Sequence, residues 1–157
     1  MSEKIKDQFA IGDLAPNFTL TSSEGNEVSL KDFRGKIAVL YFYPKDMTPG
    51  CIAEACSFRD NYYEIKKRGA EIIGISADST ASYEKFISKY QLPFILLSDP
   101  DKNVAKLYDV WKKKSLYGKL FFGIERSTFI IDEKGKLKTI FRKVKVKGHT
   151  EEVLNQI

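Results

Sequence analysis

The sequence is poor in the side chains that usually bind metals. Its 157 residues include only two cysteines and one histidine. A structural zinc site needs four ligands, most often cysteine and histidine. The sequence therefore argues against such a site, and we expect no metal cofactor.

Long hydrophobic runs are also missing. No stretch approaches the roughly 18 to 20 apolar residues that span a bilayer. The first residues, "MSEKIKDQFAIGD", lack an apolar core of signal-peptide length. We therefore expect a cytoplasmic protein without a membrane partner.

The charge balance is only mildly basic and names no partner. Lysine and arginine number 26 against 21 acidic residues, a formal net charge of +5. Two basic runs stand out, Lys112–Lys114 and "RKVKVKG" at 142–148. No aromatic and basic recognition motif accompanies either run, so nucleic-acid binding is not expected. The alternation of lysine and valine in the second run predicts one solvated face of a strand.

Apolar runs alternate with helical patterns along the whole chain, without an internal repeat. This alternation predicts one α/β domain over residues 1–157, with a central sheet flanked by helices on both faces. A thioredoxin-like layout fits the pattern, and so does a small flavodoxin-like fold. The predicted strands are 37–44, 70–78, 94–99, 126–132 and 137–144, the last two joined as a hairpin. The predicted helices are 49–68, 80–92, 102–110 and 149–157.

Both cysteines lie in "PKDMTPGCIAEAC", at 44–56. Thr48 suits a helix N-cap and Pro49 the first helical position. Cys51 then falls in the first turn, where free amide groups and the helix dipole favour a thiolate. The alternative is that two small side chains merely fill space at the start of a helix.

The spacing of the two thiols opposes a direct disulfide. On a helical wheel Cys51 shares an apolar stripe with Ala55, Phe58, Tyr62 and Ile65, whereas Cys56 lies about 140° away. Their α-carbons would be roughly 8.6 Å apart in a helix, beyond the limit of about 7 Å for a disulfide. Such a bond therefore requires local unwinding of the first turns.

These residues carry a family resemblance. The spacing of Pro44, Thr48 and Cys51 matches the active-site motif of peroxiredoxins. The longer stretch "FYPKDMTPGCIAEACSFRD" resembles the bacterioferritin comigratory protein, or peroxiredoxin Q, subgroup. "GDLAPNFTLTSSEG", "LPFILLSDPD", "YGKLFFGIERSTFIID" and "KGHTEEVL" extend the resemblance over nearly the whole chain.

The resemblance implies a thioredoxin-like fold and a peroxidase without metal or haem. It implies that Cys51 is the peroxidatic cysteine and that Cys56 resolves it within the same chain. It further implies that Thr48 bonds the thiolate and the peroxide, that Pro44 shields the pocket, and that Arg126 favours the thiolate. Expected partners are hydrogen peroxide, organic hydroperoxides and a thioredoxin-like reductant. The expected state is a monomer, with a weak dimer as the alternative.

Some features stay open in the sequence. Met47 and Ile52 depart from residues frequent in the subgroup. "SLYGKLFFGIE", at 115–125, fits either core or an exposed patch that binds a peroxide tail, a reductase or a second subunit. His149 fits a local structural role at a helix start better than a Cys–His pair. Two other functions compete, a thioredoxin-like disulfide reductase and a non-enzymatic basic binding protein.

Overall fold

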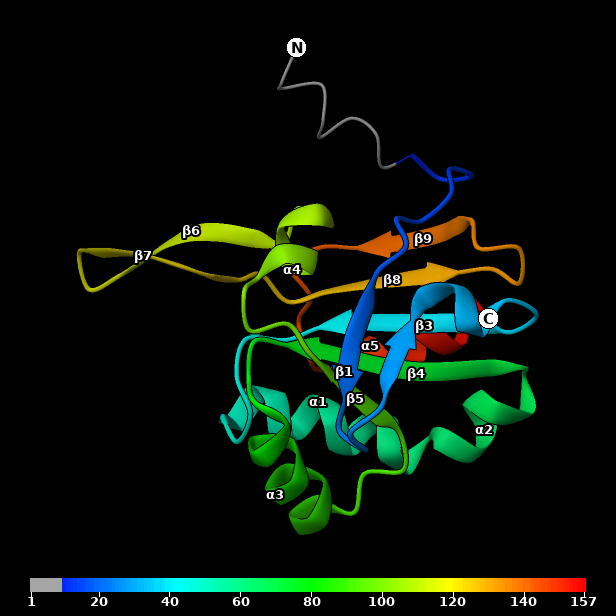
Figure 1. Ribbon diagram of the computed structural model, residues 1–157, viewed down its shortest axis with the longest axis horizontal. Coiled ribbons are helices and arrows are strands. Elements are labelled where there is room, and N and C mark those ends of the chain that lie inside the picture. The colour runs from blue at the N-terminus through cyan, green and yellow to red at the C-terminus, as the bar shows by residue number, and fades with distance from the viewer. Residues whose placement is uncertain (1–9) are drawn as a thin grey trace.

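A seven-stranded mixed sheet forms the centre of the protein (Figure 1). The computed structural model describes residues 10–157, so most of the stretch examined for a signal peptide lies outside the described residues. The strand order is β2-β1-β5-β4-β3-β8-β9. The bounds of these strands are β1 Thr19–Ser22, β2 Glu27–Ser29, β3 Ile37–Phe42, β4 Ala70–Ser76, β5 Ile95–Ser98, β8 Ser127–Ile131 and β9 Leu137–Phe141.

Helices cover both faces of this sheet and bury two separate hydrophobic cores. The helices are η2 Leu30–Phe33, α1 Pro49–Asp60, α2 Tyr62–Lys67, α3 Thr80–Tyr90, α4 Asn103–Leu107 and α5 His149–Leu154. On one face, α1, α2, α3 and α5 contribute side chains to a core that includes Cys51 and Phe58. On the other face, η2 and α4 pack with Phe18 and Tyr108. The predicted mixed sheet with helices on both faces is confirmed. Within residues 10–157, no helix combines the length and hydropathy needed to cross a bilayer.

The sheet brings distant parts of the sequence to one edge. Strand β3 pairs parallel with β4 and antiparallel with β8. Phe42, at the end of β3, lies opposite Ser127, at the start of β8. The loop that leads to Cys51 and the residue before β8, Arg126, therefore emerge at the same edge.

All five predicted strands are present, but a pair near the N-terminus was not predicted. The hairpin of β1 and β2 extends the sheet beyond β5, to which β1 pairs antiparallel. The predicted hairpin of β8 and β9 is confirmed. The second basic run does not form a strand, because β9 ends at Phe141 and 142–148 contains only bends, turns and irregular backbone. The prediction of a strand to 144, and of a solvated strand face beyond it, was wrong.

The predicted helix over 49–68 is divided in two. Helix α1 ends at Asp60, and Asn61 separates it from α2. The Asn61 side chain donates to the carbonyl of Ser57 at 2.8 Å. Asparagine side chains that bond nearby backbone groups disfavour a helix interior. The apolar stripe nevertheless faces the core, since Ala55, Phe58 and Ile65 are fully buried.

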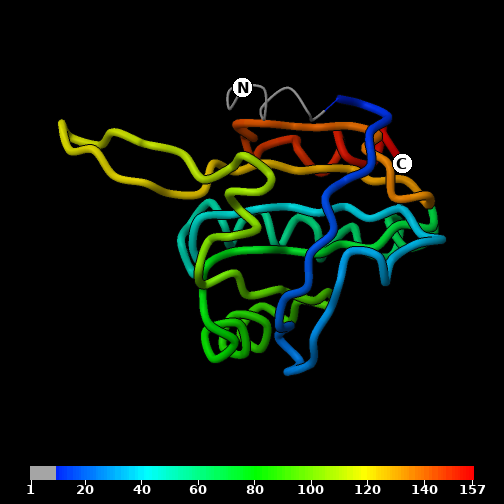
Figure 2. Tube along the Cα trace, turned by 45° about the horizontal axis from the view of Figure 1, so that its top comes forward, coloured from blue at the N-terminus to red at the C-terminus, as the bar shows by residue number. Residues whose placement is uncertain are grey.

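A second, two-stranded sheet extends away from the body of the protein. It consists of β6 (Trp111–Leu116) and β7 (Lys119–Ile124), paired antiparallel. Figures 1 and 2 show this hairpin projecting past the central sheet. Most of its residues are exposed, so the segment at 115–125 is an exposed patch rather than core.

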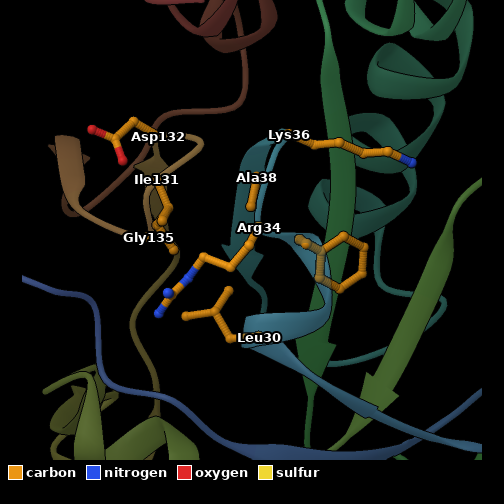
Figure 3. Close-up of a pocket in the computed structure, with 8 residues that line it drawn as sticks. Leu30, Arg34, Lys36, Ala38, Ile131, Asp132 and Gly135 are labelled. Atoms are coloured by element: carbon orange, nitrogen blue, oxygen red, sulfur yellow. The ribbon is translucent and has the colours of Figure 1, made fainter.

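One surface depression lies at the far edge of the sheet from Cys51. It is lined by residues that include Ala38, Ile131 and Arg34 (Figure 3). Ala38 and Ile131 pair at the start of β3 and the end of β8. Gly135 has a φ of +84°, and a β-carbon there would collide with the guanidinium of Arg34. Arg34 therefore fills this space, and we place no function there.

Gly74, in the middle of β4, generates a testable prediction. Its register neighbours are Tyr41 on β3 and Leu96 on β5. A β-carbon at Gly74 would lie 2.7 Å from Leu96 Cδ2 and 3.0 Å from the Tyr41 ring. We expect Gly74→Ala to lower the free energy of unfolding by about 1–3 kcal/mol through overpacking, as measured by urea denaturation.

Gly123→Ala is the matched control for this experiment. The nearest side-chain atom, Cδ of Lys114, lies 3.5 Å from a β-carbon built at Gly123, which is ordinary contact. Equal stability of the two variants would contradict the close packing around Gly74.

Candidate functional site

Helix α1 positions Cys51 in its first turn. Thr48 has the extended backbone of an N-cap, and Pro49 opens the helix as predicted. The amide of Ile52 donates to the carbonyl of Thr48 at 2.8 Å. The amides of Gly50 and Cys51 precede this first intrahelical bond, so they lie at the positive end of the helix dipole. Cys51 is nevertheless only 2% exposed.

Thr48 does not cap the helix with its side chain. Its hydroxyl instead donates to the carbonyl of Lys45 at 2.8 Å, which closes a turn between the two residues. Met47, directly before the cap, has a φ of 65°. This left-handed conformation is unusual for a residue with a side chain. The loop that enters α1 is thus tightly turned.

Arg126 reaches Cys51 from the neighbouring strand. Its Nη2 lies 3.4 Å from Sγ of Cys51, and its Nη1 donates to Oε1 of Glu54 at 2.6 Å. The guanidinium passes close to Gly50, where a β-carbon would lie 3.1 Å from Nη2. A glycine in the first turn of α1 therefore leaves room for the arginine.

Charge around Arg126 holds it firmly in its cationic form. Burial tends to lower the pKa of Arg126, but Glu54 and Cys51 outweigh this effect and raise it. The side chain is only 16% exposed. A fixed, half-enclosed positive charge thus lies beside the sulfur of Cys51.

Glu54 is a site residue that sequence reasoning missed. It is 1% exposed, and its Oε2 has no hydrogen-bond partner among the described residues. Burial raises the pKa of Glu54 to about 7, even though Arg126 acts to lower it. Its signal in the sequence was a carboxylate three residues after Cys51, because residues three apart share one helix face.

A buried network anchors the loop before Cys51. Asp46 is 5% exposed and accepts hydrogen bonds of 2.6 Å from Tyr43 Oη and from Ser82 Oγ. Its amide donates to Asp78 at 2.9 Å. These contacts tie the loop to the residue that follows β3, to α3 and to the segment after β4. Sequence reasoning did not single out any of these residues.

The other predicted site residues lie near this loop or on α1. Pro44 follows Tyr43 at the end of β3 and is half-buried. Cys56 lies on α1, also partly exposed, and both cysteines are free thiols. Both are helical residues of one continuous helix, which is the arrangement that the wheel assumed. The two thiols are not joined in a disulfide.

His149 has the local structural role expected from the sequence. It is 1% exposed at the start of α5, and its two ring nitrogens bond Thr128 at 2.8 Å and Glu152 at 2.9 Å. Burial lowers the pKa of His149, although Glu152 acts in the opposite direction. Within residues 10–157, neither ring nitrogen of His149 bonds Cys51.

Fold and site together define a class of protein. A reduced thiol lies in the first turn of a helix beside a half-buried arginine, and a second thiol follows on the same helix. This is the arrangement of a thiol-based redox enzyme, because the thiolate is the reactive form of cysteine and positive groups stabilise it.

Comparisons with known proteins identify the family. Residues 11–140 match the AhpC/TSA family. Peroxiredoxin Bcp of Bacillus subtilis (strain 168) is 50% identical over 147 residues, which cover 94% of each chain. Peroxiredoxin Bcp of Escherichia coli (strain K12) is 45% identical over 144 residues, 92% of each chain. The chain therefore belongs to the AhpC/TSA family and, within it, to the Bcp/PrxQ peroxiredoxins, which are thiol peroxidases.

Solved structures agree with this assignment. A mutant of Xylella fastidiosa PrxQ superposes with a TM-score of 0.88 at 39% identity, over 94% of each chain. Bacterioferritin comigratory protein of Xanthomonas campestris, studied for alkyl peroxide reduction, superposes with a TM-score of 0.84 at 42% identity, over 88% of each chain. The predicted thioredoxin-like fold is thereby confirmed, and the flavodoxin-like alternative is not supported.

The Asp46 network generates a prediction about pH. Burial raises the pKa of Asp46 to about 6 from an ordinary value of 3.8. Hydrogen bonds from Ser82 and Tyr43 act to lower it, and Asp78 adds to the rise. A carboxyl whose pKa is raised by folding binds more protons in the folded state. Its contribution to stability is therefore greatest at low pH and declines as the pH rises from about 4 to about 6.

We compare urea unfolding of the unchanged protein and Asp46→Asn across this window. The stability difference between them should move by about 1–3 kcal/mol in favour of the variant as the pH rises. Glu54 and His149 also make stability depend on pH, but they do so in both proteins. Their contributions therefore cancel in the difference in stability between the two. Asp101→Asn, at an exposed position, controls for loss of one charge. A constant difference between the unchanged protein and Asp46→Asn would refute the prediction.

Proposed function

We propose that Cys51 is the peroxidatic nucleophile of this thiol peroxidase and that Arg126 activates it. The observation that carries the proposal is the 3.4 Å contact between Nη2 of Arg126 and Sγ of Cys51 at a helix N-terminus. Positive charge and free amides at this point favour the thiolate, which is the attacking species. The substrates are hydrogen peroxide and alkyl hydroperoxides.

In the first step the thiolate sulfur attacks the terminal peroxide oxygen in line with the O–O bond. A sulfur–oxygen bond forms and the O–O bond breaks, so the sulfur is oxidised to a sulfenic acid and the peroxide is reduced. Hydroxide or alkoxide leaves and takes up a proton to become water or an alcohol. Negative charge moves from the sulfur toward the departing oxygen during this step. Fixed donors that face this charge lower the barrier.

Arg126 and the amides of Gly50 and Cys51 supply these donors. Glu54 is a positioning residue, because its carboxylate holds Nη1 and thereby orients Nη2 toward the sulfur. A bidentate guanidinium is suited to this task, since its two donors have a fixed relative geometry. The half-buried setting strengthens the interaction because little water screens it.

Thr48 and Pro44 complete the proposed substrate pocket. The proton of the Thr48 hydroxyl is held by the carbonyl of Lys45, so the oxygen can accept a hydrogen bond from the incoming hydroperoxide. This would orient the peroxide for attack. Pro44 has no amide proton and limits access of water from the side of β3. These two roles come from the family resemblance and the position of the loop.

In the second step the thiol of Cys56 attacks the sulfenic sulfur of Cys51. A disulfide forms, and the hydroxyl of the sulfenic acid leaves as water. Both residues are in α1, so the first turns of this helix must unwind before the sulfurs can meet. A thioredoxin-type dithiol then reduces the disulfide by two exchanges and is itself oxidised.

The two competing functions have less support. A disulfide reductase would use a pair of thiols that can bond without rearrangement, whereas the helical spacing of Cys51 and Cys56 prevents this. A basic binding protein would have no need of the buried Glu54 and its contact with Arg126. We further propose that residues 1–157 form one domain and that the protein is a cytoplasmic monomer.

The experiment for the catalytic role follows peroxide consumption with thioredoxin, its reductase and NADPH. We expect Cys51→Ser to reduce turnover to the uncatalysed rate, because no thiolate remains beside Arg126. Cys56→Ser should keep one equivalent of peroxide reduction while losing the intramolecular disulfide in non-reducing peptide mass spectrometry. Appreciable turnover of Cys51→Ser would remove Cys51 from the role of nucleophile. Only intermolecular disulfides in the unchanged protein would exclude resolution within one chain.

The unwinding of α1 can be followed by hydrogen exchange. We expect the amides around 51–56 to exchange at least about tenfold faster in the oxidised than in the reduced protein, because the disulfide is incompatible with a helix. The amides of α3 serve as the internal control and should change little. Equally slow exchange of 51–56 in both redox states would contradict the proposed resolving step.

A further inference from the structure

The β6–β7 hairpin concentrates exposed apolar side chains at one end of the molecule. Ten large hydrophobic residues are exposed among the described residues, and five of them belong to this hairpin. They are Leu116 at 56%, Tyr117 at 95%, Leu120 at 66%, Phe121 at 44% and Phe122 at 55%. Exposed apolar patches of this kind usually contact another phase or molecule.

The same hairpin is strongly basic. From Val110 to Ile124 the chain contains four lysines and no acidic residue. Lys112 pairs with Asp109 at its base, and Lys114 donates to the carbonyl of Ile124. Lys113 and Lys119 are exposed and form no ion pair within residues 10–157. The hairpin therefore complements a surface that is both apolar and negatively charged.

The apolar residues lie on both faces of the hairpin. Neighbouring residues of a strand point to opposite faces, so Phe121 and Phe122 face opposite ways. Leu120 shares a face with Phe122, and Leu116 shares a face with Phe121, as the strand register requires. A flat protein partner would cover only one of these faces. The tip projects from the body of the protein in Figures 1 and 2. A fluid medium that surrounds this tip would cover both faces of the hairpin.

We propose that the β6–β7 hairpin docks the protein on an anionic lipid surface. The tip, 116–121, enters the boundary between headgroups and acyl chains, and the lysines contact the headgroup charges. Aromatic rings favour this interfacial layer, and lysine stems extend along it toward charge. Anionic lipids attract basic segments at such depths. This binding departs from the expectation, drawn from the sequence, of a protein without a membrane partner.

The hairpin's backbone limits how deep it can go. Only β6 and β7 pair with each other in their sheet, so each has an outer edge with unbonded backbone groups. Such groups are costly in the hydrocarbon interior. The proposal is therefore peripheral binding by the tip, without a spanning segment.

Docking in this way would bring the reactive end of the protein near the lipid. Strand β7 ends at Ile124, two residues before Arg126. Burial lowers the pKa of Lys114, Arg126 lowers it further, and Glu125 and Cys51 act to raise it. The base of the hairpin is therefore two residues along the chain from the arginine that contacts Cys51.

The test is co-sedimentation of the full chain with vesicles. One set contains equal parts of phosphatidylglycerol and phosphatidylcholine, and the other contains phosphatidylcholine alone. We expect binding to the first set at low ionic strength, weaker binding as salt is added, and little binding to the second set. Trp111 is the single tryptophan and stacks on Phe122, so its emission in buffer reports whether a variant keeps the hairpin folded.

Matched variants separate the hairpin from general surface properties. Tyr117→Ser with Leu120→Ser should weaken vesicle binding at least about tenfold. The control is Tyr63→Ser with Leu14→Ser, at positions that are 80% and 62% exposed elsewhere on the surface.

Charge reversal is tested in the same way. Lys113→Glu with Lys119→Glu should also weaken binding at least about tenfold, because each lysine near an anionic surface contributes attraction. Lys67→Glu with Lys85→Glu changes the net charge equally at exposed sites on α2 and α3. Both control pairs should bind within about twofold of the unchanged protein, since docking is assigned to the hairpin.

Three results would overturn the proposal. The first is no binding of the unchanged protein to phosphatidylglycerol vesicles at low ionic strength. The second is an equal loss of binding in hairpin and control variants. The third is a dimer in lipid-free sedimentation that the hairpin variants abolish, which would assign the patch to a second copy of the chain. Cys51→Ser should bind vesicles normally, so this test is independent of the peroxidase cycle.

Discussion

The site depends on one guanidinium that bridges two elements distant in sequence. Arg126 bonds Cys51 and Glu54, which precede it by 75 and 72 residues. The bridge exists because β3 and β8 pair antiparallel, so the end of one and the start of the other share an edge. The thiol thereby gains a fixed positive neighbour in a place that water barely reaches. If β3 and β8 paired in another register, Arg126 would lie elsewhere. The dipole of α1 would then be the remaining positive influence on the sulfur.

Two residues at this edge of the sheet are held in energetically unfavourable states, and contacts with the surrounding structure offset this cost. Glu54 is buried with one carboxylate oxygen unbonded, and Met47 has a left-handed backbone. Strain and buried charge of this kind persist where neighbouring contacts over-determine the geometry. Here the Asp46 network supplies those contacts, since it ties the loop to the residue that follows β3 and to α3. Cys51 thus has a loop anchored by hydrogen bonds on one side and, on the other, the helix that the proposed resolving step would unwind.

Local patterns predicted the start of α1 well, because capping and the helical wheel involve only neighbouring residues. The side of α1 that faces the core followed from the same reasoning. Arg126 was one of 26 basic residues and emerged only through family resemblance. Asp46 was missed because nothing local tells a buried carboxylate from a solvated one, and Glu54 was missed although its spacing placed it on the helix face of Cys51. The alternating run after Phe141 looked like a strand, but its backbone turns instead, and alternation alone does not specify a hydrogen-bonding partner.

Gly50 affects both the approach of Arg126 to Cys51 and the stability of the first turn of α1. A side chain at this position would crowd Nη2 of Arg126. The arginine can therefore approach the thiol only if residue 50 has no side chain. Glycine is also among the weakest helix formers, by about 1 kcal/mol relative to alanine. Glycine therefore leaves room for the charge that we propose activates Cys51, and it also weakens the turn that the proposed resolving step would open. If the proposed cycle holds, a residue that strengthened this turn of α1 would also displace Arg126 from Cys51 and oppose the unwinding that brings Cys56 to it.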